Sequence, residues 1–203
     1  FCLKLYPTNS LVLNPSLSVL FSYSFEIDIE ENIIEQALRE KAEKHSEEGF
    51  WKAYPPIAKL KLRFSEMANP HWFAKDPEFA WGFYGHRLNL YRETSPHEGF
   101  AILRKWGASM TGGAFIYTSN VDGHFQRAGF DEEQVLECHG SINHLQCLEK
   151  CGQEIWDAEN CMVEVDLSTL RAARPLPSCP SCGKLARPNV MMFGDWRCDS
   201  TRA

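Results

Sequence analysis

The chain has 203 residues, of which 44% are hydrophobic and 24% charged, as is typical of a globular protein with one or two domains. The formal net charge of -6 does not favour nucleic acid as a partner, although an acidic chain can bind a basic peptide. No segment has the roughly 18 uninterrupted apolar residues of a membrane-spanning helix, so we expect no membrane partner.

The N-terminal part of the chain carries few signals. The chain begins with Phe1 rather than methionine, so we expect the true start to be missing. Residues 11–25 are fairly apolar, but proline, asparagine and serines interrupt them, and a signal peptide is not expected. Residues 30–48 predict an amphipathic helix with a narrow apolar face. The aromatic and proline-rich stretch over residues 48–56 indicates a loop.

Two helices follow in the sequence. Asp76-Pro77-Glu78 predicts a helix start, with an N-cap, a proline in the first turn and an acid near the helix N-terminus. This helix should run to about Arg92 and present one face made of Phe79, Phe83, Arg87 and Leu90.

The second helix is expected to begin at Ser95, because Ser95 and Glu98 have the spacing of a capping box and a proline follows Ser95. Gly107 is a plausible helix stop. The residues expected to face the core are Phe100, Leu103 and Trp106.

Three short apolar runs predict buried strands, over residues 114–118, 135–138 and 189–193. Strands that alternate with helices indicate an α/β sheet, in which polar residues just beyond the strand ends tend to line a ligand crevice. The polar residues after the first two strands are Ser119, Asn120, Asp122 and His139. Asn120 and Asp122 could bind an amide and a ribose, or could stabilise the turn. A lone histidine is more often structural than a general base.

The eight cysteines include a CxxxC pair, Cys147 and Cys151, and a CxxC pair, Cys179 and Cys182. Four thiolates in tetrahedral geometry form a closed structural zinc site. A redox CxxC motif and buried free thiols are the alternatives, but two close pairs favour zinc. A glycine after each pair lets the backbone turn and point N–H groups at the sulfurs. Thiolates held by metal favour a reducing, intracellular location, cytoplasmic or nuclear.

Taken together, these motifs resemble the sirtuin family. The segments that carry the resemblance are residues 118–123, 127–129, 137–141, the two cysteine pairs, 187–190 and 193–195. The resemblance implies an α/β fold: a Rossmann-like parallel sheet, incomplete in this chain, with a small zinc-ribbon plus helical domain. The implied division is residues 1–47 as a non-matching segment with one helix, 48–110 as the helical part of the small domain, 111–145 with 186–203 as the Rossmann-like NAD-binding domain, and 146–185 as the zinc-binding module.

The resemblance also implies an activity, NAD-dependent deacetylation or deacylation of an acylated-lysine protein or peptide. In the family the acyl oxygen attacks the ribose carbon of NAD as nicotinamide leaves, and a histidine then helps a ribose hydroxyl attack the resulting imidate, which gives free lysine and an acylated ADP-ribose. By resemblance, His139 is that catalytic base, and structural Zn²⁺ is bound by the four cysteines. The NAD-binding residues would be Ser119, Asn120 and Asp122, and the substrate peptide would lie along Val190, Phe193, Gly194 and Asp195.

Three departures from the family pattern are visible. Ser119 stands where the family usually has glutamine, and Cys138 where it usually has a larger residue. The glycine-rich NAD loop of the family should lie just before Glu48, yet Gly49 is the first glycine of the chain. We therefore expect this chain to be a fragment with weak or no activity. A non-catalytic zinc-binding interaction module and a mono-ADP-ribosyltransferase are the alternative functions.

Overall fold

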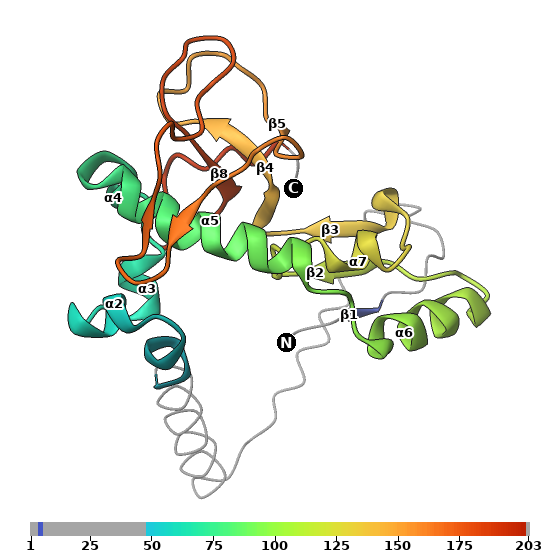
Figure 1. Ribbon diagram of the computed structural model, residues 1–203. Helices are drawn as coiled ribbons and strands as arrows, with labels where there is room; N and C mark the ends of the chain where they lie inside the picture. The colour runs from blue at the N-terminus through green and yellow to red at the C-terminus, as the bar shows by residue number, and fades with distance from the viewer. Residues whose placement is uncertain (1–3, 6–47, 202–203) are drawn as a thin grey trace, which may run out of the picture. The chain divides into compact units, whose positions relative to one another are not determined.

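The computed structural model describes residues 4–5 and 48–201 (Figure 1). The chain divides into two compact units, Phe1–Thr8 with Ser65–Ala203, and Asn9–Phe64. Among the described residues, no helix is both long and apolar enough to cross a membrane. The helix predicted over residues 30–48 lies outside the described part, apart from its last residue.

The described part of the second unit is mainly helical over residues 48–59, so the predicted loop over residues 48–56 is wrong. Residues 48–53 are helical, and helix α2 follows at Pro55–Lys59. The aromatic residues pack together, with the Phe50 ring against Tyr54 and Phe64 and the Trp51 indole N–H donating to the Leu62 carbonyl at 2.7 Å. The prolines open α2, where a missing N–H leaves no helical bond unmade.

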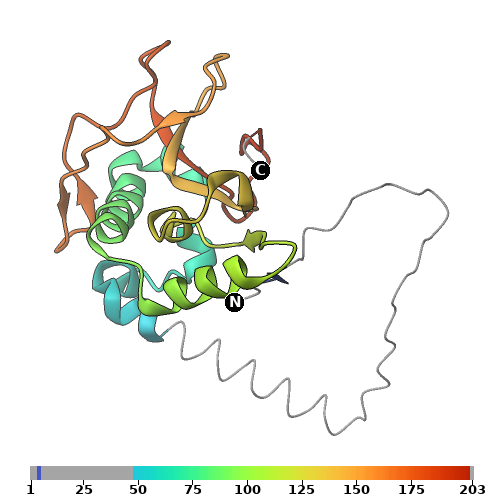
Figure 2. The same ribbon diagram turned by 90° about the vertical axis from the view of Figure 1, so that its right-hand side faces the viewer.

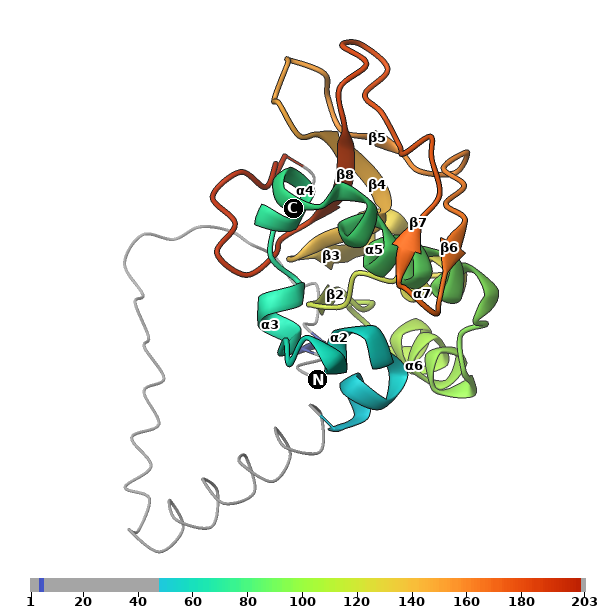
Figure 3. The same ribbon diagram turned by 60° about the vertical axis from the view of Figure 1, so that its left-hand side comes forward.

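Helix α5 (Pro77–Glu93) is the central element of the first unit and follows the short helices α3 (Phe64–Met67) and α4 (His71–Lys75). It begins where predicted, because an Asp76 carboxylate oxygen accepts the Phe79 N–H at 3.3 Å. The face predicted from Phe79, Phe83, Arg87 and Leu90 is not the only buried one, since Leu90 is 44% exposed while residues on other faces, including Trp81 and Tyr84, are buried. The helix has neighbours on several sides, among them β6 and β7 (Figure 3).

Helix α6 (Glu98–Ser109) begins two residues later than predicted, since a capping box at Ser95 would make Pro96 its first position. His97 is its N-cap, with a ring nitrogen that accepts the Gly99 N–H at 3.0 Å, so the predicted capping box at Ser95 is wrong. Gly107 is buried inside the helix and does not end it as predicted, and its lack of a side chain allows close packing against Ala114, whose Cβ would lie 2.7 Å from an added Cβ. Phe100 is in the core as expected, but Trp106 is 57% exposed.

The parallel sheet predicted from the alternation of elements is present as a strand pair, which confirms the α/β class. Strands β2 (Ile116–Thr118) and β3 (Val135–Glu137) run parallel, and β1 (Lys4–Leu5) pairs antiparallel with β2. Helix α7 (His124–Arg127) and a 3-10 turn, η1 (Glu132–Gln134), connect β2 to β3. The core between the sheet and its helices contains Phe100, Ile116, Phe125 and Phe130.

A second, antiparallel sheet was not predicted. Its central strand β4 (Gly140–Cys147) lies between β5 (Trp156–Asp157) and β8 (Ala186–Val190), and β6 (Val165–Asp166) forms a separate pair with β7 (Arg171–Ala172). The strand predicted over residues 189–193 therefore begins and ends three residues earlier, as β8. Every residue of β8 is buried, and the Trp81 indole N–H of α5 donates to the Ala186 carbonyl at 2.9 Å.

Candidate functional site

The structure brings together the four cysteines of the two pairs. Their Sγ atoms all lie within 4.8 Å of one another, and the Cys147–Cys182 and Cys151–Cys179 pairs are each 3.6 Å apart. A disulfide would place two sulfurs about 2.05 Å apart. Zinc–sulfur bonds of about 2.3 Å in tetrahedral geometry require sulfurs about 3.8 Å apart. The donor set therefore fits a structural zinc ion with no open position.

The backbone around the cysteines also suits thiolates. Burial works to raise the pKa of the Cys147 thiol, but the N–H groups of Cys151 and Glu149 and the Cys182 thiol outweigh it and lower that pKa to about 7. The N–H groups of Gln153 and Lys184 donate to the sulfurs of Cys151 and Cys182 and act to lower their pKa values, but burial and the neighbouring thiols outweigh them and raise both pKa values. The loops after β4 and before β8 project from the same end of the sheet, as all views show (Figure 2).

The glycine that follows each pair has the left-handed backbone that the turn requires. Gly152 has a φ of 93° and Gly183 a φ of 69°, and a side chain at either position would have no atom within 4 Å. The positive φ, rather than crowding, is thus the reason for glycine at these two positions. The turns direct the following N–H groups toward the sulfurs, as the sequence suggested.

The predicted polar turns meet at one edge of the parallel sheet. Thr118 of β2 is paired with Glu137 of β3, and the Cys138 N–H donates to the Thr118 carbonyl at 3.0 Å. Since parallel strands end at the same edge, Asn120 and His139, each two residues beyond its paired strand residue, lie at that edge together. The side chain of His139 is exposed at this edge, and it does not line the cavity beside the turn after β2.

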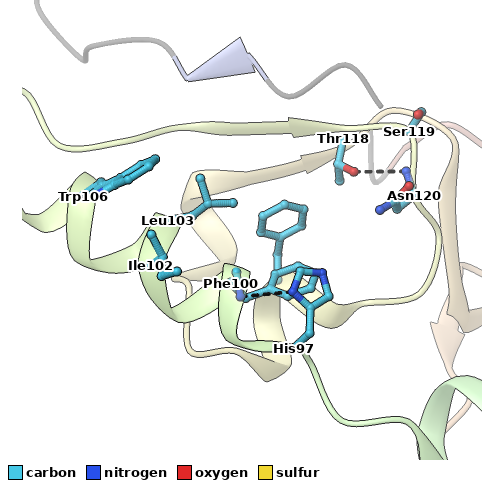
Figure 4. Close-up of a pocket in the computed structure, with 10 residues that line it drawn as sticks. His97, Phe100, Ile102, Leu103, Trp106, Thr118, Ser119 and Asn120 are labelled. Carbon is cyan, nitrogen blue, oxygen red and sulfur yellow. Dashed lines mark hydrogen bonds between the residues drawn. The ribbon is translucent and has the colours of Figure 1, made fainter.

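A cavity of about 340 Å³ opens beside this edge, between α6 and the end of β2 (Figure 4). Ser119 and Asn120 line its polar end, where the Asn120 N–H donates to the Thr118 hydroxyl at 3.1 Å. The other walls are mainly apolar side chains, including Phe100, Leu103, Trp106 and Phe125. A volume near the lower limit for ligand pockets, about 300 Å³, fits an aromatic ring with a sugar rather than a whole dinucleotide.

Asp122 does not line this cavity. Its carboxylate accepts the His124 N–H at 2.9 Å at the start of α7, so the structure gives it a turn-stabilising contact. It lies close enough to Tyr91 for its charge to contribute to raising the pKa of that phenol, after the larger effect of burial. The contact between Asp122 and a cofactor that the sequence predicted stays a prediction.

The segment expected to bind the peptide lies next to His139. The His139 carbonyl accepts the Met191 N–H at 2.9 Å, and Gly140 pairs with Val190. Within the segment, the Phe193 N–H donates to the Ala68 carbonyl at 2.9 Å. The Phe193 side chain is 53% exposed.

Two buried polar side chains beneath this segment, those of Arg187 and Asn189, were not among the predicted site residues, whereas Asp195 was predicted to lie along the peptide. Arg187 is 1% exposed and forms an ion pair with the fully buried Asp195 carboxylate. Asn189 is also buried and donates to the Gln146 side chain at 3.0 Å. A signal existed, because an arginine and an asparagine inside a buried strand require polar partners.

The chain is similar to the Sir2 family over residues 44–202. It is 32% identical over 148 residues to an NAD-dependent protein deacylase of Aquifex aeolicus, covering 73% of this chain and 53% of that protein. It is 33% identical over 151 residues to an NAD-dependent protein deacylase of Thermus thermophilus, covering 73% of this chain and 50% of that one. The chain thus spans about half the length of these curated relatives.

Solved structures agree with this likeness. The crystal structure of a Sir2 homologue–NAD complex matches with a TM-score of 0.53 and 31% identity, over 66% of this chain and 46% of that one. A mutant Sir2 homologue in complex with 2'-O-acetyl ADP ribose matches with a TM-score of 0.53 and 30% identity, over 67% and 49%. Since the family model covers most of the chain, the chain belongs to the Sir2 family.

Proposed function

We propose that the protein to which this chain belongs is an NAD-dependent protein-lysine deacylase. The observation that carries the proposal is the parallel pairing of β2 with β3, which puts the 119–122 turn, its cavity and His139 at one sheet edge. The names of the relatives and the NAD complex of a structural neighbour support the same activity.

The cavity would hold the nicotinamide end of the cofactor. Bound NAD supplies a ribose carbon that becomes electrophilic as nicotinamide leaves. The apolar walls from α6 and α7 would exclude water from this ring and so strengthen every polar contact nearby. Ser119 and Asn120 would orient the ring and sugar through hydrogen bonds, with Asp122 as a further polar partner at the turn.

His139 would act as the general base. Its ring would take a proton from a ribose hydroxyl and hold it while that hydroxyl attacks the carbon of the acyl group, the role of a general base. The ring stands at a strand end, with its backbone carbonyl fixed by the Met191 N–H. Positioning by the strand keeps the base in place while its side chain stays accessible.

The acyl-lysine peptide would lie along Val190 and residues 193–195 as an added strand. The Val190 carbonyl and the Phe193 N–H already have partners in Arg187 and Ala68. The peptide would therefore use other backbone groups of this segment, those of Gly194 among them. The exposed Phe193 ring would contact the substrate side chain.

The domain division and location inferred from the sequence form part of this proposal. The zinc-binding module at residues 146–185 would connect the two parts of the Rossmann-like domain, at 111–145 and 186–203, and residues 48–110 would belong to the small domain. Thiols arranged for metal rather than disulfides fit a reducing, intracellular compartment.

The experiment is nicotinamide release by the zinc-loaded chain from NAD and an acetyl-lysine peptide, compared with the unmodified peptide. Binding of NAD and of each peptide is measured by calorimetry alongside, because residues 1–48 contain no glycine and slow release is expected. The active-site variant is His139→Ala. Its control is His86→Gln, a histidine of α5 outside the cavity lining.

We expect acetyl-dependent nicotinamide release over many turnovers to fall roughly 10²–10⁴-fold in His139→Ala, and not in His86→Gln, because nicotinamide leaves before the histidine acts and the variant cannot complete the turnover. A folded, zinc-loaded protein that binds neither NAD nor the acetyl group selectively would contradict the proposal and favour an interaction module. Release without acetyl-lysine, with label from NAD attached to protein, would favour mono-ADP-ribosyl transfer.

A further inference from the structure

Arg187 and Asp195 form a buried ion pair beneath the proposed peptide-binding segment. Arg187 is a residue of β8 with a side chain only 1% exposed, and the carboxylate of Asp195 is 0% exposed. The same guanidinium donates to the Val190 carbonyl at 2.8 Å and to the Pro188 carbonyl at 3.4 Å. One side chain therefore holds both ends of the segment from Val190 to Asp195.

The backbone of this segment is shaped to return to Arg187. Gly194 has a φ of 70°, which an ordinary residue adopts only with strain, and the Asp195 N–H donates to the Met192 carbonyl at 3.2 Å. The second oxygen of the Asp195 carboxylate accepts the Arg197 N–H at 2.9 Å. The carboxylate is therefore fixed at the inner end of a turn.

The two sides of the segment differ in character. The ion pair fixes the buried side, while Met191, Phe193 and Trp196 are 47%, 53% and 94% exposed. These apolar side chains are exposed to solvent, while Arg187 contacts the backbone of the segment at Val190 and the carboxylate of Asp195 on its buried side. Met191 and Phe193 within the segment, and Trp196 next to it, therefore offer exposed apolar side chains to a bound molecule.

A second set of contacts holds the chain just after the segment. The Gln146 side chain donates to the Arg197 carbonyl at 2.9 Å, and the Asn189 side chain donates to the Asp199 carbonyl at 2.8 Å. Residues 197–199 are thus attached to β4 and β8 independently of Arg187. Loss of the ion pair should consequently increase the mobility of residues 190–195, while residues 197–199 stay attached to β4 and β8.

A buried ion pair is weak evidence for stability, because removing two charges from water costs about as much as their attraction returns. Its value here is geometrical, since guanidinium and carboxylate fix one arrangement through directed hydrogen bonds. We propose that Arg187 is a positioning residue, which sets the affinity for the acyl-lysine peptide by holding residues 190–195 without touching the peptide. This inference rests on the proposed function.

The principal variant is the double substitution Arg187→Met with Asp195→Asn, in the full zinc-loaded chain. It removes both charges together, so that neither is left buried alone, and it keeps similar side-chain volumes. A second variant, Arg187→Lys, keeps the charge but not the forked donor geometry. The control is Arg174→Met, which removes an exposed arginine paired with Glu78 at 2.8 Å.

Four quantities are measured for each protein: zinc content, thermal midpoint, and the affinities for acetyl-lysine peptide and for NAD by calorimetry. Hydrogen exchange of residues 190–197 is followed by mass spectrometry. We expect the double variant to keep zinc and its NAD affinity, to exchange faster at 190–195, and to bind the peptide at least tenfold more weakly. Arg187→Lys should show the same pattern to a smaller degree, and Arg174→Met should match wild type.

Peptide affinity that is unchanged in a folded double variant would overturn the inference. A parallel fall in peptide affinity, NAD affinity and zinc content in both variants would also overturn it, since that pattern indicates general loss of structure. A wild-type chain that does not distinguish acetylated from unmodified peptide contradicts the proposed function itself. This result is separate from failure of the inference on Arg187, because it is seen in the wild-type chain without any variant.

Discussion

Gly140, between His139 and the rest of β4, is a position where one methyl group should have a large effect. Its φ is 73°, and an added Cβ would lie 2.1 Å from the Asn189 carbonyl oxygen and 3.1 Å from the carbonyl carbon. The left-handed backbone costs an ordinary residue roughly 1–2 kcal/mol. Forcing atoms into a packed site adds about 1–3 kcal/mol. Gly140→Ala should thus lower the free energy of unfolding by about 2–5 kcal/mol.

The strain and the close contact can be separated with Gly183→Ala. Gly183 has a similar φ of 69°, but an added Cβ has nothing within 4 Å, so only the strain of roughly 1–2 kcal/mol applies. Both variants are compared with wild type by urea denaturation at saturating zinc, with circular dichroism as the signal. Equal losses of unfolding free energy in the two variants would refute the reasoning. The close contact between a Cβ at residue 140 and the Asn189 carbonyl would then add no cost.

Other perturbations have equally definite outcomes. Cys179→Ser should release zinc to a chromogenic chelator and lower the thermal midpoint sharply, whereas Cys161→Ser, outside the cluster, should keep one zinc ion per chain. Trp81→Phe leaves a buried carbonyl of β8 without its donor and should destabilise the chain by about 1–3 kcal/mol in urea denaturation. Burial works to raise the pKa of Asp195, but the hydrogen bond and charge of Arg187 hold that pKa below its usual 3.8. Stability from this pair should therefore be present above pH 3.8 and be lost as the pH falls below it, and a flat acid denaturation profile would contradict this.

Local signals in the sequence determined several features correctly. The cap at Asp76 marked the start of α5, because a carboxylate followed by proline satisfies helix N–H groups regardless of distant residues. Apolar runs located β2 and β3, and the cysteine spacing identified the zinc-type cluster. The order of motifs identified the family.

The ends and faces of other elements depended on neighbours distant in the chain. Trp106 has the spacing of a core residue but is exposed, and Leu90 likewise. The loop expected at residues 48–56 is helical because its aromatic side chains pack on one another. Periodicity shows which residues share a face, but it does not show which face another element covers.

At the candidate site, the sequence by itself determined which residue types follow each strand, and so predicted Asn120, His139 and the four cysteines. Only the tertiary structure decided that β3 lies beside β2 in parallel, which places Asn120 and His139 at one edge. It also decided that Arg187 and Asp195 meet beneath the segment between them. The physical reason is that strand pairing and buried ion pairs join residues that are close in space but distant along the chain. The sequence does not show which distant residues become partners.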